Sequence, residues 1–236
     1  MLFRSAYERL MRGEQAQLLF TDPPYGVRYQ GRTSRRLRIA NDGPGELAQL
    51  LASSLSAADG VLAPGASVYC FHPAGPLAGI FHDAFLGAGW SLRQGLVWVK
   101  HPLVMGRADY HYRHEPLLYG FKPGPERLGR GAAGWYGDNK QSTVFEAPRP
   151  RSSAAHATMK PVELIAACLR NSSRRGELVL DPFAGSGSTL VACEQFGRRA
   201  RLIELDPGYC DVIVERFETL TGIRATRRGG AVGAAD

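Results

Sequence analysis

Two short segments of the chain combine residue types that can hold a reacting group and a bound ligand. One segment is Asp22-Pro23-Pro24-Tyr25, which directly follows an apolar run at residues 17–21. The other is the glycine-rich stretch 181–189, which begins with Asp181 and follows an apolar run at residues 177–180. Apolar runs of this length are typical of buried strands, so each segment puts a carboxylate at the carboxyl end of a predicted strand. Since ligands bind at that edge of an open α/β sheet, we expect the two segments to form one site.

The first segment has the composition of a site that holds an amine. Its two prolines fix the backbone and leave their carbonyl oxygens without competing local amides. The Asp22 carboxylate would accept one N–H of an exocyclic amine and the Pro23 carbonyl the other, while Tyr25 would stack on the ring. Holding both hydrogens out of the ring plane localises the nitrogen lone pair for in-line attack on a methyl carrier, so positioning and pre-aimed dipoles would carry the catalysis. An ordinary Pro-Pro turn after a strand is the alternative.

The second segment has the features of a nucleoside site. Gly185 and Gly187 let the backbone pass close to a ligand, and free amides at the start of the following predicted helix suit an anion. Glu204 lies near the carboxyl end of the next predicted strand, where it can accept hydrogen bonds from two ribose hydroxyls. Because no lysine follows Gly187, the segment is not a phosphate-binding loop for ATP, and a nucleoside that carries an amino acid fits better. A tight turn with a surface acid is the simpler alternative.

Basic residues follow the first segment closely. Five arginines and no acid lie between residues 28 and 38, namely Arg28, Arg32, Arg35, Arg36 and Arg38. Guanidinium groups pair with phosphate through two hydrogen bonds, so this stretch is either a phosphate-gripping loop or a solvated one. A second polar stretch, 100–114, holds Lys100 and His114 and would line either a nucleic-acid cleft or the protein surface. Its histidines have no cysteine or acid at ligand spacing, so we expect no metal.

Length and composition set the class of protein. The 236 residues, of which 44% are hydrophobic, fit one α/β domain with a substantial core. The net charge of +7 is compatible with a polyanionic partner. The four cysteines are far apart and form no C-x-x-C pair, which favours free core thiols. No run resembles a membrane span or a secretory signal, so we expect a cytoplasmic protein with no membrane partner.

Alternating helical and strand patterns predict the elements that carry both segments. Apolar residues at helical spacing predict helices over 5–13, 46–59, 77–86, 161–171, 186–196 and 207–220. Short apolar or alternating runs predict strands over 17–21, 66–71, 94–100, 115–121, 142–145, 177–180 and 201–205. This alternation predicts a mainly parallel sheet with helices on both faces, in a single domain over 1–236. Within it, 122–155 is a short Gly-rich insert, and 224–236 is expected to be a disordered tail.

The paired motifs resemble those of amino-methylating DNA methyltransferases that use S-adenosylmethionine. Residues 22–25 match the family's D-P-P-Y motif, residues 181–189 its D-P-F-x-G-S-G-[ST]-T motif, and their order is that of the permuted β group. The resemblance implies a Rossmann-like sheet of seven strands, one antiparallel, with a target base rotated out of the duplex. The catalytic residues would be Asp22, Pro23, Pro24 and Tyr25. Cofactor contacts would come from Thr158, Lys160, Pro161, Asp181, Phe183, Ala184, Gly185, Ser186, Gly187, Glu204 and Leu205.

The same resemblance favours N6 of adenine as the target, because cytosine-N4 enzymes more often carry serine in place of the first aspartate. Alternatives are cytosine N4, an RNA base, a glutamine side-chain amide, for which Asn in place of Asp22 is commoner, and a catalytically impaired DNA-binding module. Expected contacts to DNA come from Arg28, Arg32, Arg35, Arg36, Lys100 and His114.

Two departures from the family pattern qualify these expectations. The short insert 122–155 offers few side chains to base edges, which predicts a short or relaxed recognition sequence, or help from a second copy in a homodimer. Family members also carry a Gly-Asp strand segment before the helix predicted at 5–13. Without that segment we expect weaker contact with the adenine ring of the cofactor.

Overall fold

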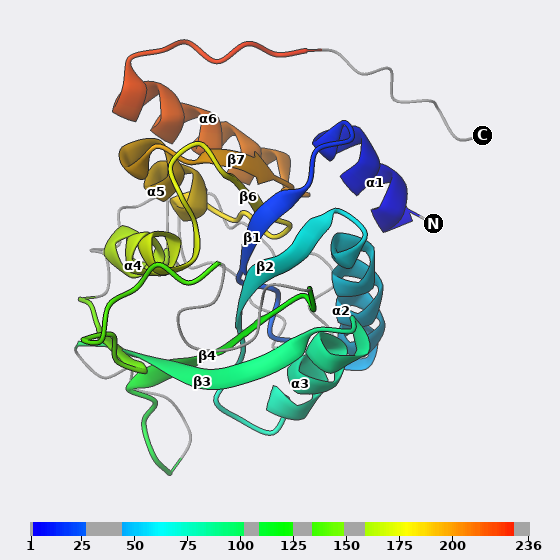
Figure 1. Cartoon of the computed structure of the whole chain (residues 1–236), viewed down its shortest axis with the longest axis vertical. Coiled ribbons are helices and arrows are strands. Elements are labelled where there is room, and N and C mark those ends of the chain that lie inside the picture. Colours follow the sequence, from blue (N-terminus) through cyan, green and yellow to red (C-terminus); the bar gives the residue numbers. More distant parts are fainter. Residues whose placement is uncertain (1, 27–43, 102–108, 125–133, 149–158, 229–236) are drawn as a thin grey trace.

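The computed structural model describes residues 2–26, 44–101, 109–124, 134–148 and 159–228. Within these ranges the strands form one seven-stranded sheet in the order β5-β3-β4-β2-β1-β6-β7 (Figure 1). The strands are β1 Ala16–Thr21, β2 Leu62–Phe71, β3 Ser91–Val99, β4 His114–Phe121, β5 Val144–Glu146, β6 Leu178–Asp181 and β7 Arg199–Leu202. The expected Rossmann-like α/β fold is confirmed.

Strand direction determines which residues share an edge of this sheet. β1 pairs in parallel with β2 and β6, β6 with β7, and β3 with β5. β4 is antiparallel to both of its neighbours, β2 and β3, and is the one antiparallel strand in the described part of the sheet. The first residues of β4 therefore lie at the same edge as the carboxyl ends of the other strands.

Helices cover both faces of the sheet (Figure 1). They are α1 Leu2–Met11, α2 Pro44–Asp59, α3 Ala78–Gly87, α4 Val162–Ser172, α5 Ser188–Phe196 and α6 Pro207–Thr221. Helices α1 to α3 bury one core, which includes Leu19 and Val68, whereas α4 and α5 bury another, which includes Phe20 and Tyr69. Consecutive residues of β1 and β2 thus enter opposite cores, which explains why residues 18–20 and 68–71 are apolar without a break.

Local sequence signals fix where the helices near the site begin. Asp206 caps α6, because its side chain accepts hydrogen bonds from the backbone amides of Gly208 and Tyr209 at 2.7 and 3.1 Å. Gly187 precedes α5 with a φ of 77°, a left-handed conformation that favours glycine. A Cβ atom at Gly187 would lie 2.9 Å from the Ile213 side chain, so this glycine also lets α5 and α6 pack closely.

Every predicted helix and strand is present, and the differences lie at element ends. β7 ends at Leu202, so Glu204 lies in the loop after the strand rather than within it. The reason is that the Glu204 carboxylate accepts hydrogen bonds from the backbone amides of Leu205 and Asp206, both at 2.9 Å, which turns the chain away from the sheet.

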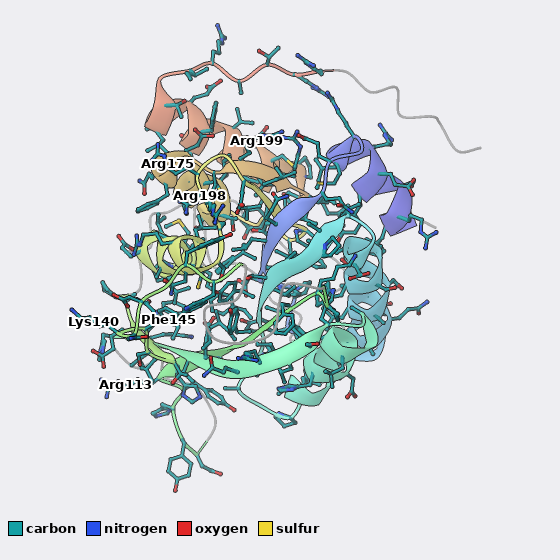
Figure 2. All side chains as sticks on the ribbon, in the orientation of Figure 1. Arg113, Lys140, Phe145, Arg175, Arg198 and Arg199 are labelled. Carbon is teal, nitrogen blue, oxygen red and sulfur yellow. The ribbon has the colours of Figure 1, made fainter. Side chains whose placement is uncertain are left out.

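The described part of the insert packs against the body of the protein. Its strand β5 extends the sheet beside β3. The backbone amide of Tyr136 donates to the carbonyl of Asn171 in α4 at 2.8 Å, and the Trp135 and Tyr119 rings lie 6.0 Å apart. Figure 2 shows Lys140 and Phe145 near one end of β3, with Arg113 close by. Two large side chains of the insert, Trp135 and Phe145, thus pack against the core that α4 and α5 cover.

No helix in the described ranges is long and apolar enough to cross a membrane. Residues 224–228 form neither helix nor strand, and residues 229–236 lie outside the described ranges. Disorder of the tail 224–236 stays a prediction.

Candidate active site

The two motifs found in the sequence leave neighbouring strands at the same edge of the sheet. β1 and β6 pair in parallel, with Leu18 opposite Val179 and Leu19 opposite Leu180. Asp22 follows the last residue of β1, and Asp181 is the last residue of β6. The structure therefore brings the two predicted halves of the site together.

Asp22 is held by two hydrogen-bond donors. The Lys160 Nζ atom lies 2.5 Å from its Oδ2 atom, and the Tyr25 hydroxyl donates to Oδ1 at 3.0 Å. The side chain of Lys160 is only 10% exposed and that of Asp22 28%. Lys160 stands just before α4, so the segment that leads into this helix delivers a cation to the end of β1.

Glu115 is a second carboxylate of this site, and the sequence pattern assigns it no role. Its Oε2 atom lies 2.9 Å from Lys160 Nζ and accepts from the Tyr25 hydroxyl at 3.4 Å, while its Oε1 atom lies 2.5 Å from Lys100 Nζ. Glu115 reaches the site because it is the second residue of the antiparallel strand β4. An acid at the start of a strand can be recognised as a site residue only once that strand is known to be antiparallel.

Burial and the close charges set the ionisation of these groups. Burial raises the pKa of Asp22 above its ordinary value, although the Lys160 ammonium opposes that rise. Burial also opposes the charge of Glu115, but the ammonium groups of Lys160 and Lys100 outweigh it and lower the pKa of Glu115 to about 2. Burial likewise lowers the pKa of Lys160, yet Asp22 and Glu115 more than offset this effect, so its net shift is upward. The negative charges of Asp22 and Glu115 are thus balanced by the positive charges of Lys160 and Lys100.

Aromatic rings enclose the charged cluster. The Tyr25 ring meets the Phe81 ring edge to face, with centroids 5.9 Å apart. The Lys160 Nζ atom lies 5.6 Å from the centroid of Tyr25 and 4.6 Å from that of Phe71. The ammonium group therefore lies beside the ring that the sequence predicts to stack on a base.

Backbone amides fix the Glu204 carboxylate beside the glycine-rich loop. Its Oε2 atom accepts from the amide of Gly185 at 2.7 Å, in addition to the two amides on Oε1. Burial raises the pKa of Glu204, and these amides oppose that rise. A carboxylate has about four acceptor sites, so three amides leave room for one further donor.

Asp181 organises the loop from within. It is 3% exposed and accepts hydrogen bonds from the Thr189 hydroxyl at 2.6 Å and from the Phe183 amide at 3.1 Å. Burial raises its pKa to about 7, against the lowering effect of these two donors. Asp181 therefore shapes the turn into α5 through its own side chain.

The other predicted cofactor residues divide by exposure. Pro161 and Ala184 are buried, whereas Phe183, Gly185 and Ser186 are partly exposed. Leu205 is 72% exposed, an unusual value for a leucine. Thr158 lies outside the described residues.

The predicted DNA contacts divide in a similar way. His114 is exposed at the start of β4, at the same edge as Asp22. Lys100 is 9% exposed, and its ammonium pairs with Glu115 instead of pointing outward. The arginines Arg28, Arg32, Arg35 and Arg36 lie outside the described residues.

The described residues contain no cluster of three or more histidine, cysteine or acidic side chains that could hold a metal ion. All four cysteines are free, and three of them, Cys70, Cys168 and Cys193, are buried.

Comparison with known proteins points in the same direction as this geometry. The family model for N6 and N4 methyltransferases, described as DNA methylase, matches residues 16–215. A protein of Escherichia coli strain K12 named as a methylase, YubD, is 31% identical over 224 residues, which cover 93% of this chain and 88% of YubD. The type II methyltransferase M.Cfr9I of Citrobacter freundii is 32% identical over 142 residues, which cover 55% of this chain and 45% of M.Cfr9I. The chain thus spans about half the length of that relative.

A solved structure shares the fold. The protein TTHA0409 of Thermus thermophilus, named as a DNA modification methylase and solved with S-adenosyl-L-methionine, is 25% identical with a TM-score of 0.64. The alignment covers 92% of this chain and 93% of TTHA0409. With a family match that spans both motifs and all seven strands of the sheet, the chain belongs to the DNA methylase family of N6 and N4 methyltransferases.

Proposed function

We propose that this protein transfers a methyl group from S-adenosylmethionine to an exocyclic amino group of a base in DNA, and that the base is adenine. The observation that carries the proposal is the position of Asp22 and the Gly185–Glu204 contact at the ends of neighbouring strands. One strand end offers a carboxylate to an amine, and the other offers a fixed acid and a glycine turn to a nucleoside.

The glycine turn fits the nucleoside part of such a cofactor. The remaining acceptor site of Glu204 would take one ribose hydroxyl, and a second hydroxyl would have to displace the Gly185 amide. The exposed Leu205 side chain would give the adenine ring an apolar surface. A Cβ atom at Gly185 would meet no atom within 4 Å, so the space beside this loop is open. The cofactor supplies a methyl group activated by attachment to a positively charged sulfur.

Asp22 and the adjacent prolines would orient the amine. The Pro23 carbonyl accepts no hydrogen bond within the described residues, so it is free to accept one N–H of the amine. Asp22 would accept the other N–H and hold the nitrogen lone pair toward the methyl carbon. As the N–C bond forms, the C–S bond breaks and its electron pair stays on sulfur, and the excess proton on nitrogen passes to Asp22. The raised pKa of Asp22, which results from its burial, suits it to receive this proton.

Tyr25 would support the target base from one side. Its hydroxyl is fixed by Asp22 and Glu115, and its ring by Phe81, so the ring is held before any base arrives. The aspartate at the first position of the motif favours N6 of adenine, and cytosine N4 is the second candidate because the family includes both activities.

DNA contacts are expected from two parts of the chain. Exposed His114 lies beside the site, and the five arginines between residues 28 and 38 follow directly after Tyr25 and Gly26. Among the described residues of the insert, Trp135 and Phe145 pack against the core of the protein, which is consistent with few contacts to base edges and a relaxed recognition sequence. A homodimer and a cytoplasmic location remain part of the proposal.

The test is incubation of the protein with labelled S-adenosylmethionine and unmethylated DNA of mixed sequence, followed by mass spectrometry of the released nucleosides. Formation of N6-methyladenine supports the proposal, and N4-methylcytosine would change the target base alone. Absence of both, together with no binding of the cofactor in calorimetry, would favour a DNA-binding module without methyl-transfer activity.

A further inference from the structure

We infer that the Lys160 ammonium occupies the place of the target amine beside Asp22 when no target base is bound, and that Glu115 is a positioning residue that keeps Lys160 in an ion pair when the amine displaces it from Asp22. Both roles concern how an amine reaches Asp22, so this inference rests on the proposed function. The resemblance to known enzymes assigns Lys160 to the cofactor and gives Glu115 no role.

Asp22 already has donors on both oxygens. Lys160 Nζ lies 2.5 Å from Oδ2, and the Tyr25 hydroxyl donates to Oδ1. The same ammonium lies 5.6 Å from the Tyr25 ring centroid, beside the surface on which a base would stack. An ammonium group donates three hydrogen bonds, so it satisfies Asp22 as an amine would. Two donors leave about two of the acceptor sites of the Asp22 carboxylate open. A base amine nevertheless competes with Lys160 for position, because the ammonium lies over the Tyr25 ring, where a stacked base would bring its amine.

Glu115 makes this exchange possible because it is already a partner of the same nitrogen. Its Oε2 atom lies 2.9 Å from Lys160 Nζ. Removing Lys160 from Asp22 without another carboxylate would leave a buried ammonium unpaired, which is strongly unfavourable. With Glu115 in place, Lys160 can give up Asp22 and remain in an ion pair. The Phe71 ring, whose centroid lies 4.6 Å from Lys160 Nζ, adds a cation–π attraction that depends on neither carboxylate.

Charges from several elements act on this exchange. Lys160, Tyr25 and Glu115 act directly on the pKa of Asp22, and the charge of Asp22 in turn raises the pKa values of Asp181 at the end of β6 and of Cys70 in β2. Lys100 pairs with the other oxygen of Glu115. If Glu115 lost its charge, Lys160 would have Asp22 as its one carboxylate partner in the cluster and would hold it more firmly. Asp22 would then stay ionised to lower pH but would be less accessible to the amine.

The test compares Glu115→Gln with the wild-type protein in single-turnover methyl transfer to unmethylated mixed-sequence DNA, measured as a function of pH. We expect the plateau rate of Glu115→Gln to fall about tenfold or more, the effect of one charged hydrogen bond. The acid limb of its pH profile should move to lower pH. The apparent KM for DNA should change by less than about twofold, because phosphate contacts dominate binding.

Two further variants separate the exchange from loss of structure. Asp59→Asn removes another partly buried carboxylate, which pairs with Lys122 at 3.2 Å away from the site, and should leave rate and acid limb unaltered. Glu115→Asp keeps the charge, so its rate should lie between those of wild type and Glu115→Gln, with the acid limb at the wild-type pH.

The outcomes distinguish the exchange from the proposed function. A wild-type protein that transfers no methyl group overturns the proposed function and the exchange with it. An active wild type overturns the exchange alone if Glu115→Gln matches it, or if the rate falls with no movement of the acid limb. A Glu115→Asp profile displaced as far as that of Glu115→Gln also overturns it, because charge would then not be the cause.

Discussion

Lys160 Nζ lies 2.5 Å from Asp22 Oδ2, although 138 residues separate the two along the chain. This contact joins the segment before α4 to the end of β1, and it puts a cation next to the carboxylate that the sequence singles out for chemistry. The contact also links the two halves of the site, because α4 leads directly into β6 and the glycine-rich loop. The predictions that follow test what each half contributes.

Replacement of Asp22 by Asn should slow methyl transfer strongly and leave the affinity for the cofactor nearly unchanged. The amide keeps the shape of the side chain but removes the charge that orients the amine and receives its proton, so we expect a rate loss of about 100-fold or more. Single-turnover transfer from labelled cofactor measures the loss, and calorimetry should give a cofactor affinity within about twofold of the wild type. Substantial transfer by this variant would show that Asp22 does not hold the amine.

Glu204→Gln should weaken cofactor binding by about 10- to 100-fold, which corresponds to the loss of one charged hydrogen bond. In one orientation of the glutamine amide, its NH2 group faces the Gly185 N–H, which is also a donor. In the other orientation, the acceptor that remains for a ribose hydroxyl is lost. Calorimetric titration with S-adenosylmethionine is the measurement. Glu194→Gln, at an exposed position of the adjacent helix α5, is the matched control and should bind as the wild type does. Equal affinities for the two variants would remove Glu204 from the cofactor site.

Asp181→Asn should remove a pH dependence of stability. The folded-state pKa of Asp181 is raised to about 7, so the folded protein binds this proton more tightly than the unfolded chain does. The stabilisation is fully present below the unfolded pKa, declines as the pH rises above it, and is lost above about pH 7. Asparagine stays neutral and can keep its partners Thr189 and Phe183, so it should be the more stable variant at neutral pH, by about 4 kcal/mol at most.

Chemical denaturation of wild type and Asp181→Asn at several pH values measures this difference. The gap between their free energies of unfolding should widen from acid to neutral pH. Asp83→Asn, at an exposed position of α3, controls for a change in net charge and should follow the wild type. A gap that is constant with pH would mean that Asp181 is ionised in the folded protein throughout this range.

Sequence patterns are sufficient to predict the fold and to predict that the two motifs lie side by side at one edge of the sheet. The runs at residues 17–21 and 177–180 are typical of buried strands because helices cover both of their faces, which makes residues 18–20 and 178–180 apolar without a break. A strand followed by a carboxylate then fixes the edge at which that carboxylate lies. For this reason Asp22 and Asp181 can be paired without knowledge of any contact.

Sequence patterns do not predict the direction in which the Lys160 side chain points or the antiparallel direction of the strand that carries Glu115. The place of Lys160 before a helix near the glycine-rich loop suggests a cofactor contact, yet its side chain turns toward Asp22. The sequence pattern assigns Glu115 no role, because an acid at the start of a predicted strand does not show which edge of the sheet it reaches. It becomes part of the site only because β4 runs antiparallel and starts at the active edge. Both facts depend on packing between segments far apart in the chain.

The arginines that follow Tyr25 provide the last prediction. Replacement of Arg35 and Arg36 by Ala should weaken binding to duplex DNA and reduce its salt dependence, because each lost phosphate contact lowers the slope of log affinity against log salt by about one. Arg174 and Arg175 are a matched pair for the control, since they are exposed in the turn before β6, at the opposite edge of the sheet from Asp22. Fluorescence anisotropy with a labelled duplex over a range of salt concentrations gives both slopes. The control pair should give the wild-type slope of log affinity against log salt. If the Arg35 and Arg36 double variant gives that slope too, the stretch between residues 28 and 38 does not bind phosphate.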